Sequence, residues 1–289
     1  MEKSKVYFTK NISSQSLIKI FKMLNTNLFG NVAVKISTGE PGGHNFLDPN
    51  LIKDLVKMVN GTIVECNTAY EGKRSNTKDH WQAIKDHGFL NIAKCDIMDE
   101  DGQMELKVPN GKRIKVNYVG SHLAHYNSIL MLSHFKGHAM GGFGGALKNM
   151  SIGVASSYGK AYIHGSGDPK HLWDGDHNSF LESMADACAS VVNYMGSKNI
   201  VYINVANNLS VDCDCDSNPH APEMADIGIF ASLDPVALDK ACYDAVINSP
   251  DKGKAALIER MTSRNAIHTV MQAELENLGT TNYEIVNID

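Results

Sequence analysis

The chain has 289 residues, 43% hydrophobic and 20% charged, so it is neither disordered nor fibrous and is long enough to bury a core without disulfide staples. A formal net charge of −5 argues against a nucleic-acid binder, because such proteins present clustered positive charge. With no long apolar stretch and no signal-peptide pattern in residues 1–11, we expect a cytoplasmic protein without a membrane partner, its six cysteines reduced.

Strand and helix signals alternate through the first half of the chain. Strands are predicted over 6–8, 31–36 and 62–65, and helices over 14–24, 48–59 and 77–87. Asp48 before Pro49 marks a helix start, since aspartate caps the first turn and proline fits it. Alternating residues over 106–116, around Pro109-Asn110-Gly111, predict a β-hairpin.

The second half continues the alternation. Further strands are predicted over 129–132, 200–205, 227–231 and 283–286, and helices over 179–195, 234–247, 254–261 and 266–278. The pattern predicts an α/β fold with a mostly parallel sheet flanked by helices and with the hairpin as an insertion. Because the sequence contains no clear linker, we expect one domain over 1–289, or two lobes around a cleft whose boundary the sequence does not mark.

Histidines gather in one part of the chain. Seven of the twelve lie between positions 122 and 177: His122, His125, His134, His138, His164, His171 and His177. Neutral imidazole is a common metal ligand and transfers protons near neutral pH. Any one of these side chains is more often a surface or structural group, but the cluster as a whole indicates a site.

The segment SHFKGHAMGGFGGALKN, residues 133–149, is the sharpest motif. It follows a predicted strand, and open α/β sheets bind ligands at the carboxyl ends of their strands. Its glycines would expose backbone N–H groups to a phosphate or carboxylate, and Lys136 and Lys148 would add positive charge. It is neither a Walker A loop nor a dinucleotide fingerprint, and a plain glycine-rich turn is the alternative.

Two more polar loops follow predicted strands. The segment STGEPGGHN, residues 37–45, carries Glu40 and His44, and Lys73 and Arg74 follow the strand over 62–65. Adjacent basic residues at a strand end suit an anionic ligand. In a parallel sheet the two glycine-rich loops, residues 37–45 and 133–149, would face one cleft. The alternatives are a solvated turn acid for Glu40 and ordinary surface charge for the basic pair.

Two cysteines alternate with three aspartates over residues 212–216, and His220 lies close by. Thiolates and carboxylates in this arrangement would bind a divalent metal through Cys213 and Cys215 or contact a cluster. The CxC pair lacks the second pair of a structural zinc site, so an acidic loop with incidental cysteines is the alternative.

Several blocks in one order resemble domain-of-unknown-function family 362, whose members are often described as iron–sulfur centre proteins. The blocks are VKISTGEPGGHNFLDP (34–49), NTAYEGKRSN (67–76), 133–149, GKAYIH (159–164) and 212–239. The resemblance implies a cytoplasmic prokaryotic protein linked to redox or metal chemistry. Many members insert a ferredoxin-like segment after the position of His164. Residues 165–178 contain no cysteine, so we expect no cubane cluster of that kind.

The spacing of His138, Gly142-Phe143, Lys148 and His164 is similar to the pattern of nickel-pincer lactate racemases. This resemblance implies that His138 is an acid/base, that Lys148 holds the pincer nucleotide covalently and that His164 ligates nickel. A second acid/base histidine, which such an enzyme needs, is not placed by the sequence. A shared fold does not by itself carry shared chemistry.

We therefore expect a metal- or cofactor-binding enzyme that acts on a small anionic substrate by redox or acid/base chemistry. The expected catalytic residues are His138 and Lys148. The expected ligands of a divalent metal (nickel, iron or zinc) are His134, His164, Cys213 and Cys215. A small anionic ligand or a nucleotide-like cofactor would contact Glu40, His44, Lys73, Arg74, Lys136, Gly142, Gly144 and Gly145. The alternatives are a non-catalytic redox or metal-binding accessory module and a pincer-nickel racemase or epimerase-like enzyme.

Overall fold

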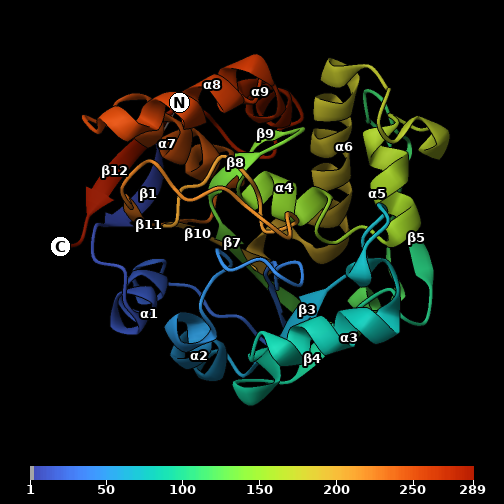
Figure 1. Cartoon of the computed structure of the whole chain (residues 1–289), viewed down its shortest axis with the longest axis horizontal. Helices are drawn as coiled ribbons and strands as arrows, with labels where there is room; N and C mark the ends of the chain where they lie inside the picture. The colour runs from blue at the N-terminus through green and yellow to red at the C-terminus, as the bar shows by residue number, and fades with distance from the viewer. Residues whose placement is uncertain (1–2) are drawn as a thin grey trace.

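A sheet of eight strands runs through the molecule (Figure 1), and the computed structural model describes residues 3–289. Its order is β12-β1-β11-β10-β7-β2-β3-β4. The strands are β1 (Ser4–Thr9), β2 (Val32–Lys35), β3 (Gly61–Glu65), β4 (Cys95–Ile97), β7 (Ser128–His134), β10 (Ile200–Ala206), β11 (Gly228–Ser232) and β12 (Tyr283–Asn287). The strands from β10 to β4 are all parallel, while β11 is antiparallel to both of its neighbours. The predicted α/β fold is confirmed.

The chain order of the strands reverses in the middle of this parallel block. From β2 the chain adds β3 and then β4 on one side, whereas β7 and then β10 lie on the other side of β2. The reversal between β2 and β7 leaves a crevice beyond their carboxyl ends, and this is where open α/β sheets place their ligands.

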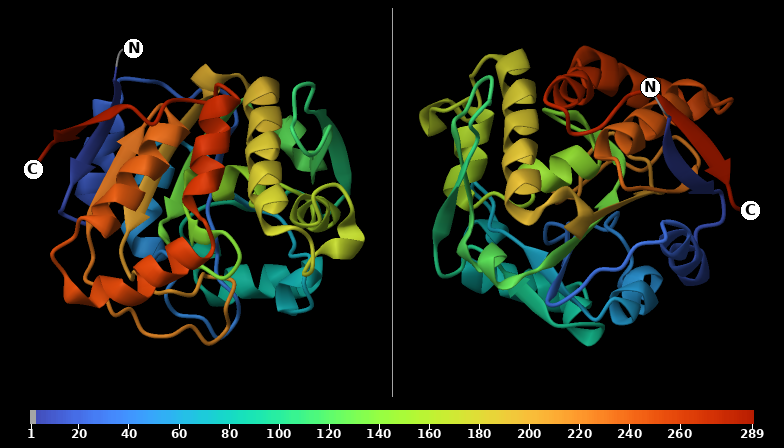
Figure 2. Two further views of the ribbon diagram at one scale, coloured as in Figure 1. Left: turned by 90° about the horizontal axis from the view of Figure 1, so that it is seen from above. Right: turned by 180° about the vertical axis from the view of Figure 1, so that it is seen from behind.

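Helices cover both faces of the sheet (Figure 2). One face carries α1 (Ser14–Met23), α2 (Pro49–Met58) and α3 (Thr77–Asp86), and the other carries α4 (Ala146–Ser151), α6 (His177–Met195), α7 (Pro235–Ile247) and α9 (Ile267–Leu275). The remaining helices are α5 (Ser157–His164) and α8 (Ala255–Ser263). The predicted helix start at Asp48 is confirmed, since Asp48 accepts a hydrogen bond from the Asn50 amide (2.8 Å). The helix predicted from residue 234 begins in the same way, with Asp234 accepting from the Ala237 amide (2.9 Å) before Pro235.

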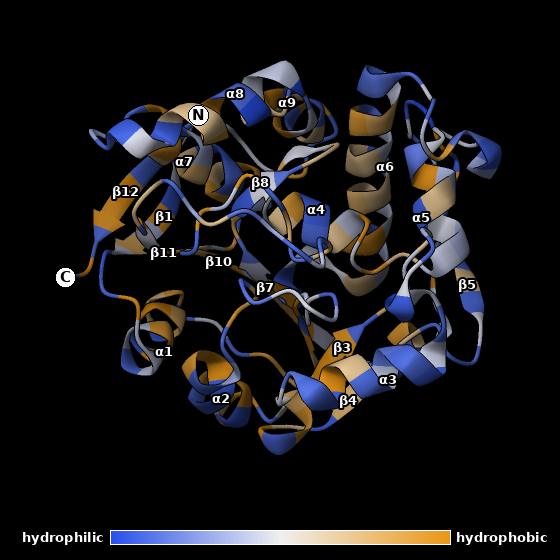
Figure 3. Ribbon diagram, viewed as in Figure 1, coloured by the Kyte–Doolittle hydropathy of each residue, from blue (hydrophilic) through white to orange (hydrophobic). Residues whose placement is uncertain are grey.

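Successive strand residues are buried on opposite faces, which explains the apolar character of the central strands. In β7, Leu130 packs with α1 and α2, while Met131 packs with α4 and α6. Burial of each such side chain contributes about 1.5–3 kcal/mol. Figure 3 shows hydrophobic residues concentrated in central strands such as β3, whereas α3 on the outside is largely hydrophilic.

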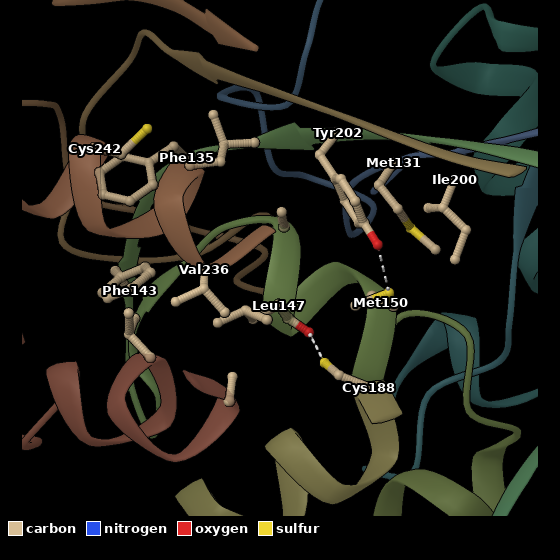
Figure 4. Close-up of a cluster of buried hydrophobic side chains, with 14 of the residues drawn as sticks. Met131, Phe135, Phe143, Leu147, Met150, Cys188, Ile200, Tyr202, Val236 and Cys242 are labelled. Carbon is tan, nitrogen blue, oxygen red and sulfur yellow. Dashed lines mark hydrogen bonds between the residues drawn. The ribbon is translucent and has the colours of Figure 1, made fainter. Parts of the chain in front are cut away.

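Helix α4 lies inside the core between the sheet and the outer helices (Figure 4). Its Met150 accepts a hydrogen bond from the Tyr202 hydroxyl of β10 (3.6 Å to the sulfur), and the Leu147 carbonyl accepts one from the Cys188 thiol of α6 (3.1 Å). All four residues are buried. The short helix is therefore fixed by packing rather than by its own length.

The predicted hairpin is confirmed, but its strands lie further from the turn than expected. They are β5 (Gln103–Lys107) and β6 (Val116–Gly120), and the Pro109-Asn110-Gly111 turn lies within the long loop between them. The buried carboxylate of Asp186 on α6 accepts hydrogen bonds from three consecutive amides of that loop, residues 112–114. A tertiary contact therefore sets the loop length, and the local pattern does not reveal it.

The glycine-rich segment over 133–149, which we expected to form a loop, is not one continuous loop. The segment contains β8 (Lys136–His138), β9 (Gly142–Gly144) and the first residues of α4, and β8 and β9 pair antiparallel. Strands of three residues are too short to show a periodic pattern, which also explains why β4 was not predicted. Within residues 3–289, no helix is both long and apolar enough to cross a membrane.

Candidate functional site

A cavity of about 710 Å³ opens at the carboxyl ends of β2, β3 and β7, beside the reversal of strand order. Its wall comes from segments that are far apart in the sequence: the loops after β2 and β3, the β8–β9 hairpin with α4, helix α5, and residues 212–217 after β10. The two glycine-rich segments and the basic loop, which carries Lys73 and Arg74 after β3, thus meet at one site.

Most of the candidate residues line this cavity. They are Glu40, Lys73, Arg74, His134, Lys136, His138, Gly144, Gly145, Lys148, His164, Cys213 and Cys215. Two candidates lie outside it. His44 is exposed on the first glycine-rich loop, and Gly142 packs against Arg264 and Ala266. The roles predicted for the lining residues remain predictions, which the contacts below help to weigh.

One buried ion-pair network joins the ends of β2 and β3 to the basic loop. The Lys35 ammonium lies 2.9 Å from Glu65, and the Arg74 guanidinium lies 2.7 Å from Glu40 and 3.4 Å from Glu65. Burial raises the pKa of Glu65, but the charges of Lys35 and Arg74 outweigh it and hold that pKa at about 2. Glu40 and Arg74 therefore bind each other, and their charges are already compensated.

Neither Lys35 nor Glu65 was predicted as a site residue. Each is the last residue of an otherwise apolar strand, and both are almost completely buried. A charged residue at the carboxyl end of a buried strand is the sequence signal that would have identified them, because burial of a charge requires a partner.

A second buried network surrounds Asp214. Its carboxylate lies 2.6 Å from the Lys136 ammonium and 3.1 Å from Nδ1 of His134, and Nε2 of His134 donates to the Asn207 carbonyl (2.6 Å). Burial raises the pKa of Asp214, but Lys136 and His134 hold it well below its usual range. Both ring nitrogens of His134 are engaged, so this side chain offers a metal no free lone pair, contrary to its predicted role.

Two cavity lysines have no carboxylate partner among residues 3–289. The Lys148 ammonium makes no hydrogen bond or ion pair with the described residues, and the Lys160 ammonium donates only to the Ala155 carbonyl (2.6 Å). Burial, together with the charges of Lys136 and Lys35, lowers the pKa of Lys148 to about 7. Burial also lowers the pKa of Lys160. Lys148 therefore holds its proton weakly at neutral pH.

The ring of His164, at the end of α5, has a defined tautomer. Its Nδ1 donates a hydrogen bond to the Lys160 carbonyl (2.7 Å), and the ring stacks on Phe180 (4.6 Å between ring centres). Nε2 therefore keeps its lone pair. Burial lowers the pKa of His164 to about 4, with the Lys160 carbonyl acting in the opposite direction, so the ring is neutral at pH 7.

His138 has the opposite tautomer. Its Nδ1 accepts hydrogen bonds from the amides of Met140 (3.2 Å) and Gly141 (2.9 Å), so the proton of the neutral ring resides on Nε2. Burial and the charge of Lys148 place the pKa of His138 well below 6.5. The ring is thus held as a neutral hydrogen-bond donor at Nε2. This geometry differs from that of the expected general base, which needs a free lone pair.

Cys213 and Cys215 form a disulfide, so the expectation of six reduced thiols is wrong for this pair. The other four cysteines are free thiols: Cys66, Cys95, Cys188 and Cys242. A ring nitrogen of His138 and the two sulfur atoms lie within 4.8 Å of one another. In the disulfide form the pair has no thiolate to offer a metal, so its predicted ligand role would require reduction first.

The glycines of the second loop serve backbone packing more than anion binding. A Cβ on Gly145 would lie 2.5 Å from a carboxylate oxygen of Asp239, which accepts hydrogen bonds from the amides of Ala146 (2.8 Å) and Leu147 (2.9 Å). Asp239 therefore already occupies the first amides of α4, and the predicted contact of an anion with the glycine N–H groups remains a prediction. Gly144 differs, since its missing Cβ leaves space 3.6 Å from the Lys148 side chain.

Comparison with solved structures finds two partial similarities. The lactate racemase apoprotein from Thermoanaerobacterium thermosaccharolyticum is 14% identical, with a TM-score of 0.48 over 84% of this chain and 57% of its own. A protein from Thermotoga maritima is 12% identical, with a TM-score of 0.47 over 80% of this chain and 57% of its own. This chain thus spans little more than half the length of either.

No curated protein matches the sequence. The profile of the family described as "Domain of unknown function (DUF362)" matches residues 32–244, which run from the start of β2 into α7. The chain therefore belongs to family DUF362, as the order of its motifs predicted.

Proposed function

We propose that this protein is an enzyme that binds a small anionic substrate in the cavity and acts on it by acid/base chemistry at Lys148. The observation that carries the proposal is the unpaired Lys148 amine, which faces a cavity whose other charged groups are mostly compensated. Amines with a lowered pKa in a cleft are typical of functional sites.

The charge balance of the wall supports an anionic substrate. Lys35, Arg74 and Lys136 each contact a buried carboxylate, whereas Lys148 and Lys160 have no such partner among the described residues. Buried cations are costly unless they are paired. A carboxylate or phosphate group of the substrate would supply the missing negative charge through charge-assisted hydrogen bonds.

The protonation states of three side chains suggest three different roles in the reaction. With a pKa of about 7, Lys148 exchanges a proton readily at neutral pH or attacks a carbonyl as the free amine. His138 supplies an N–H at Nε2 for an oxygen that gains negative charge, as a neutral imidazole can. His164 supplies a lone pair at Nε2 as proton acceptor or ligand.

A divalent metal is an optional cofactor within this proposal, and His164 is the residue that would hold it. A ligating imidazole characteristically donates its other N–H to a carbonyl or carboxylate, and His164 does so to the Lys160 carbonyl. Such an ion would polarise a substrate oxygen. Lys148 beside His164 also suits covalent attachment of a cofactor, so a pincer-nickel racemase or epimerase is the second candidate.

Thermal unfolding with added anions tests the proposal. Saturating phosphate or oxalate should raise the melting temperature of the wild-type protein by several degrees, because a ligand that binds only the folded state stabilises it. Lys148→Met and Lys160→Met should lose most of this shift. Lys85→Met, on the exposed side of α3, should keep it. Equal shifts in all four proteins, or no shift at all, would contradict an anion site in the cavity.

A further inference from the structure

The disulfide between Cys213 and Cys215 lies on the cavity wall, and the proposed acid/base function gives it no role. Both cysteines line the cavity, and a ring nitrogen of His138 lies within 4.8 Å of both sulfur atoms. Cys66, the other cysteine on the wall, is a buried thiol whose pKa burial raises to about 12, so it stays protonated. The pair is therefore the redox-competent sulfur site of the described cavity wall.

The segment that carries the pair is held in place without the disulfide. The Asp214 carbonyl accepts a hydrogen bond from the Glu40 amide (2.8 Å), and the Asp214 carboxylate binds Lys136. On one side Gly137 packs against the backbone of Val211, and on the other Gly42 packs against the Ser217 carbonyl. These contacts hold residues 211–217 between the two glycine-rich loops, and none of them involves a sulfur atom.

The disulfide should also contribute little to the stability of the fold. It joins residues two positions apart, and a crosslink that closes so short a loop constrains the unfolded chain least. Stabilisation therefore does not explain its position. A disulfide that lies on the wall of a ligand-sized cavity and closes so short a loop is placed for exchange with a thiol.

We propose that Cys213 and Cys215 form a redox-active pair that exchanges two electrons with an external dithiol admitted to the cavity. One thiolate of the dithiol attacks a protein sulfur, and the protein S–S bond breaks. The released cysteine thiolate receives a hydrogen bond from the Nε2 N–H of His138 and takes up a proton from water. The second thiol then displaces the first protein sulfur. The products are a protein dithiol and the disulfide of the reagent, and the reverse reaction reoxidises the pair.

Alkylation of the native protein followed by mass spectrometry tests this proposal. Trypsin releases residues 199–240 as one peptide, which contains Cys213 and Cys215 and no other cysteine. In buffers poised with reduced and oxidised dithiothreitol, this peptide should change from no alkyl group to two in one two-electron transition. A parallel sample that is unfolded and fully reduced before alkylation, in which all six cysteines should be labelled, reports that the reagent works throughout.

Two variants complete the experiment. In Cys213→Ser, the remaining Cys215 should form a mixed disulfide with glutathione under native conditions. The double variant Cys213→Ser/Cys215→Ser should melt within about 2 °C of the wild-type protein, because a short-loop crosslink contributes little. Lys148→Met should keep the redox transition, so failure of the proposed acid/base function would leave this result intact.

Three results would overturn the proposal. The first is a disulfide that dithiothreitol reduces only in denaturant. The second is a pair that stays alkylatable at the oxidising end of the titration. The third is a large fall in the melting temperature of the double variant, which would identify a structural crosslink instead.

Discussion

The buried amine of Lys148 lowers the stability of the folded protein below about pH 10, and its proposed role in acid/base chemistry would explain why it is there. Its pKa is about 7 in the folded protein, against an ordinary value of 10.5. Between these values the unfolded chain binds more protons than the folded one, so this group makes the free energy of unfolding rise with pH from about 7 to about 10. Below pH 7 the folded protein carries the full cost of the buried charge.

Replacement of Lys148 by methionine should therefore stabilise the protein while removing the proposed acid/base function. At pH 6 we expect Lys148→Met to unfold with a free energy about 1–3 kcal/mol above that of the wild-type protein, since a buried charge is replaced by an apolar chain of similar length. This advantage should shrink by pH 9. Urea unfolding of both proteins at the two pH values measures it. If the free energy of unfolding of Lys148→Met exceeds that of wild type by less at pH 6 than at pH 9, the prediction is contradicted.

At this scale the sequence could indicate candidate residues but not their protonation or redox states. His138, Lys148 and His164 were selected by their resemblance to the racemase pattern, and all three line the cavity, while their roles remain predictions. The tautomers of the two histidines depend on backbone groups that only the folded chain brings near, such as the Gly141 amide and the Lys160 carbonyl. The Cys213–Cys215 bond depends likewise on the local backbone, and the composition favoured free thiols.

Elements with their own caps and periodicity were predictable from the sequence, and elements held by distant contacts were not. Helices α2 and α7 begin with an aspartate cap within their own segment. The N-terminal amides of α4 are instead capped by Asp239, more than ninety positions away. Local sequence patterns do not reveal such a cap. The same limit applies to β8 and β9, which pair only because the loop folds back on itself.

The ion-pair network at the ends of β2 and β3 should contribute strongly to the free energy of unfolding. Glu65→Gln would leave Lys35 and one side of Arg74 buried without a countercharge, which typically costs about 3–5 kcal/mol. The exposed Glu284 on β12 offers a matched control, and Glu284→Gln should change the free energy of unfolding by less than about 0.5 kcal/mol. Chemical denaturation at pH 7 measures both.

The pKa of Glu65 also predicts how the free energy of unfolding falls at acidic pH, and the same variants test this. Since the pKa of Glu65 is about 2 when folded and 4.5 ordinarily, its stabilisation is present above pH 4.5 and is lost as the pH falls toward 2. Wild type and Glu284→Gln should lose stability over this range more steeply than Glu65→Gln. Parallel acid limbs in all three proteins would show that the network is not strongly coupled to folding.

At the scale of the whole molecule, topology explains why the site exists. The reversal of strand order between β2 and β7 brings loops more than a hundred positions apart to one crevice, and the expected meeting of the two glycine-rich loops follows from that rule. The family match begins at residue 32, yet β1 and β12 complete the same sheet. That residues 1–289 form one domain remains a prediction.

The most direct test of the account is the pKa of Lys148 itself, with and without an anion. Competitive labelling of the lysine amines, read out by mass spectrometry across pH 5–11, yields a pKa for each lysine. We predict about 7 for Lys148, a rise when saturating phosphate binds beside it, and no change at the exposed Lys85. A Lys148 amine that titrates near 10.5 and ignores phosphate would contradict the central claim that an unpaired, weakly basic amine awaits an anionic substrate in this cavity.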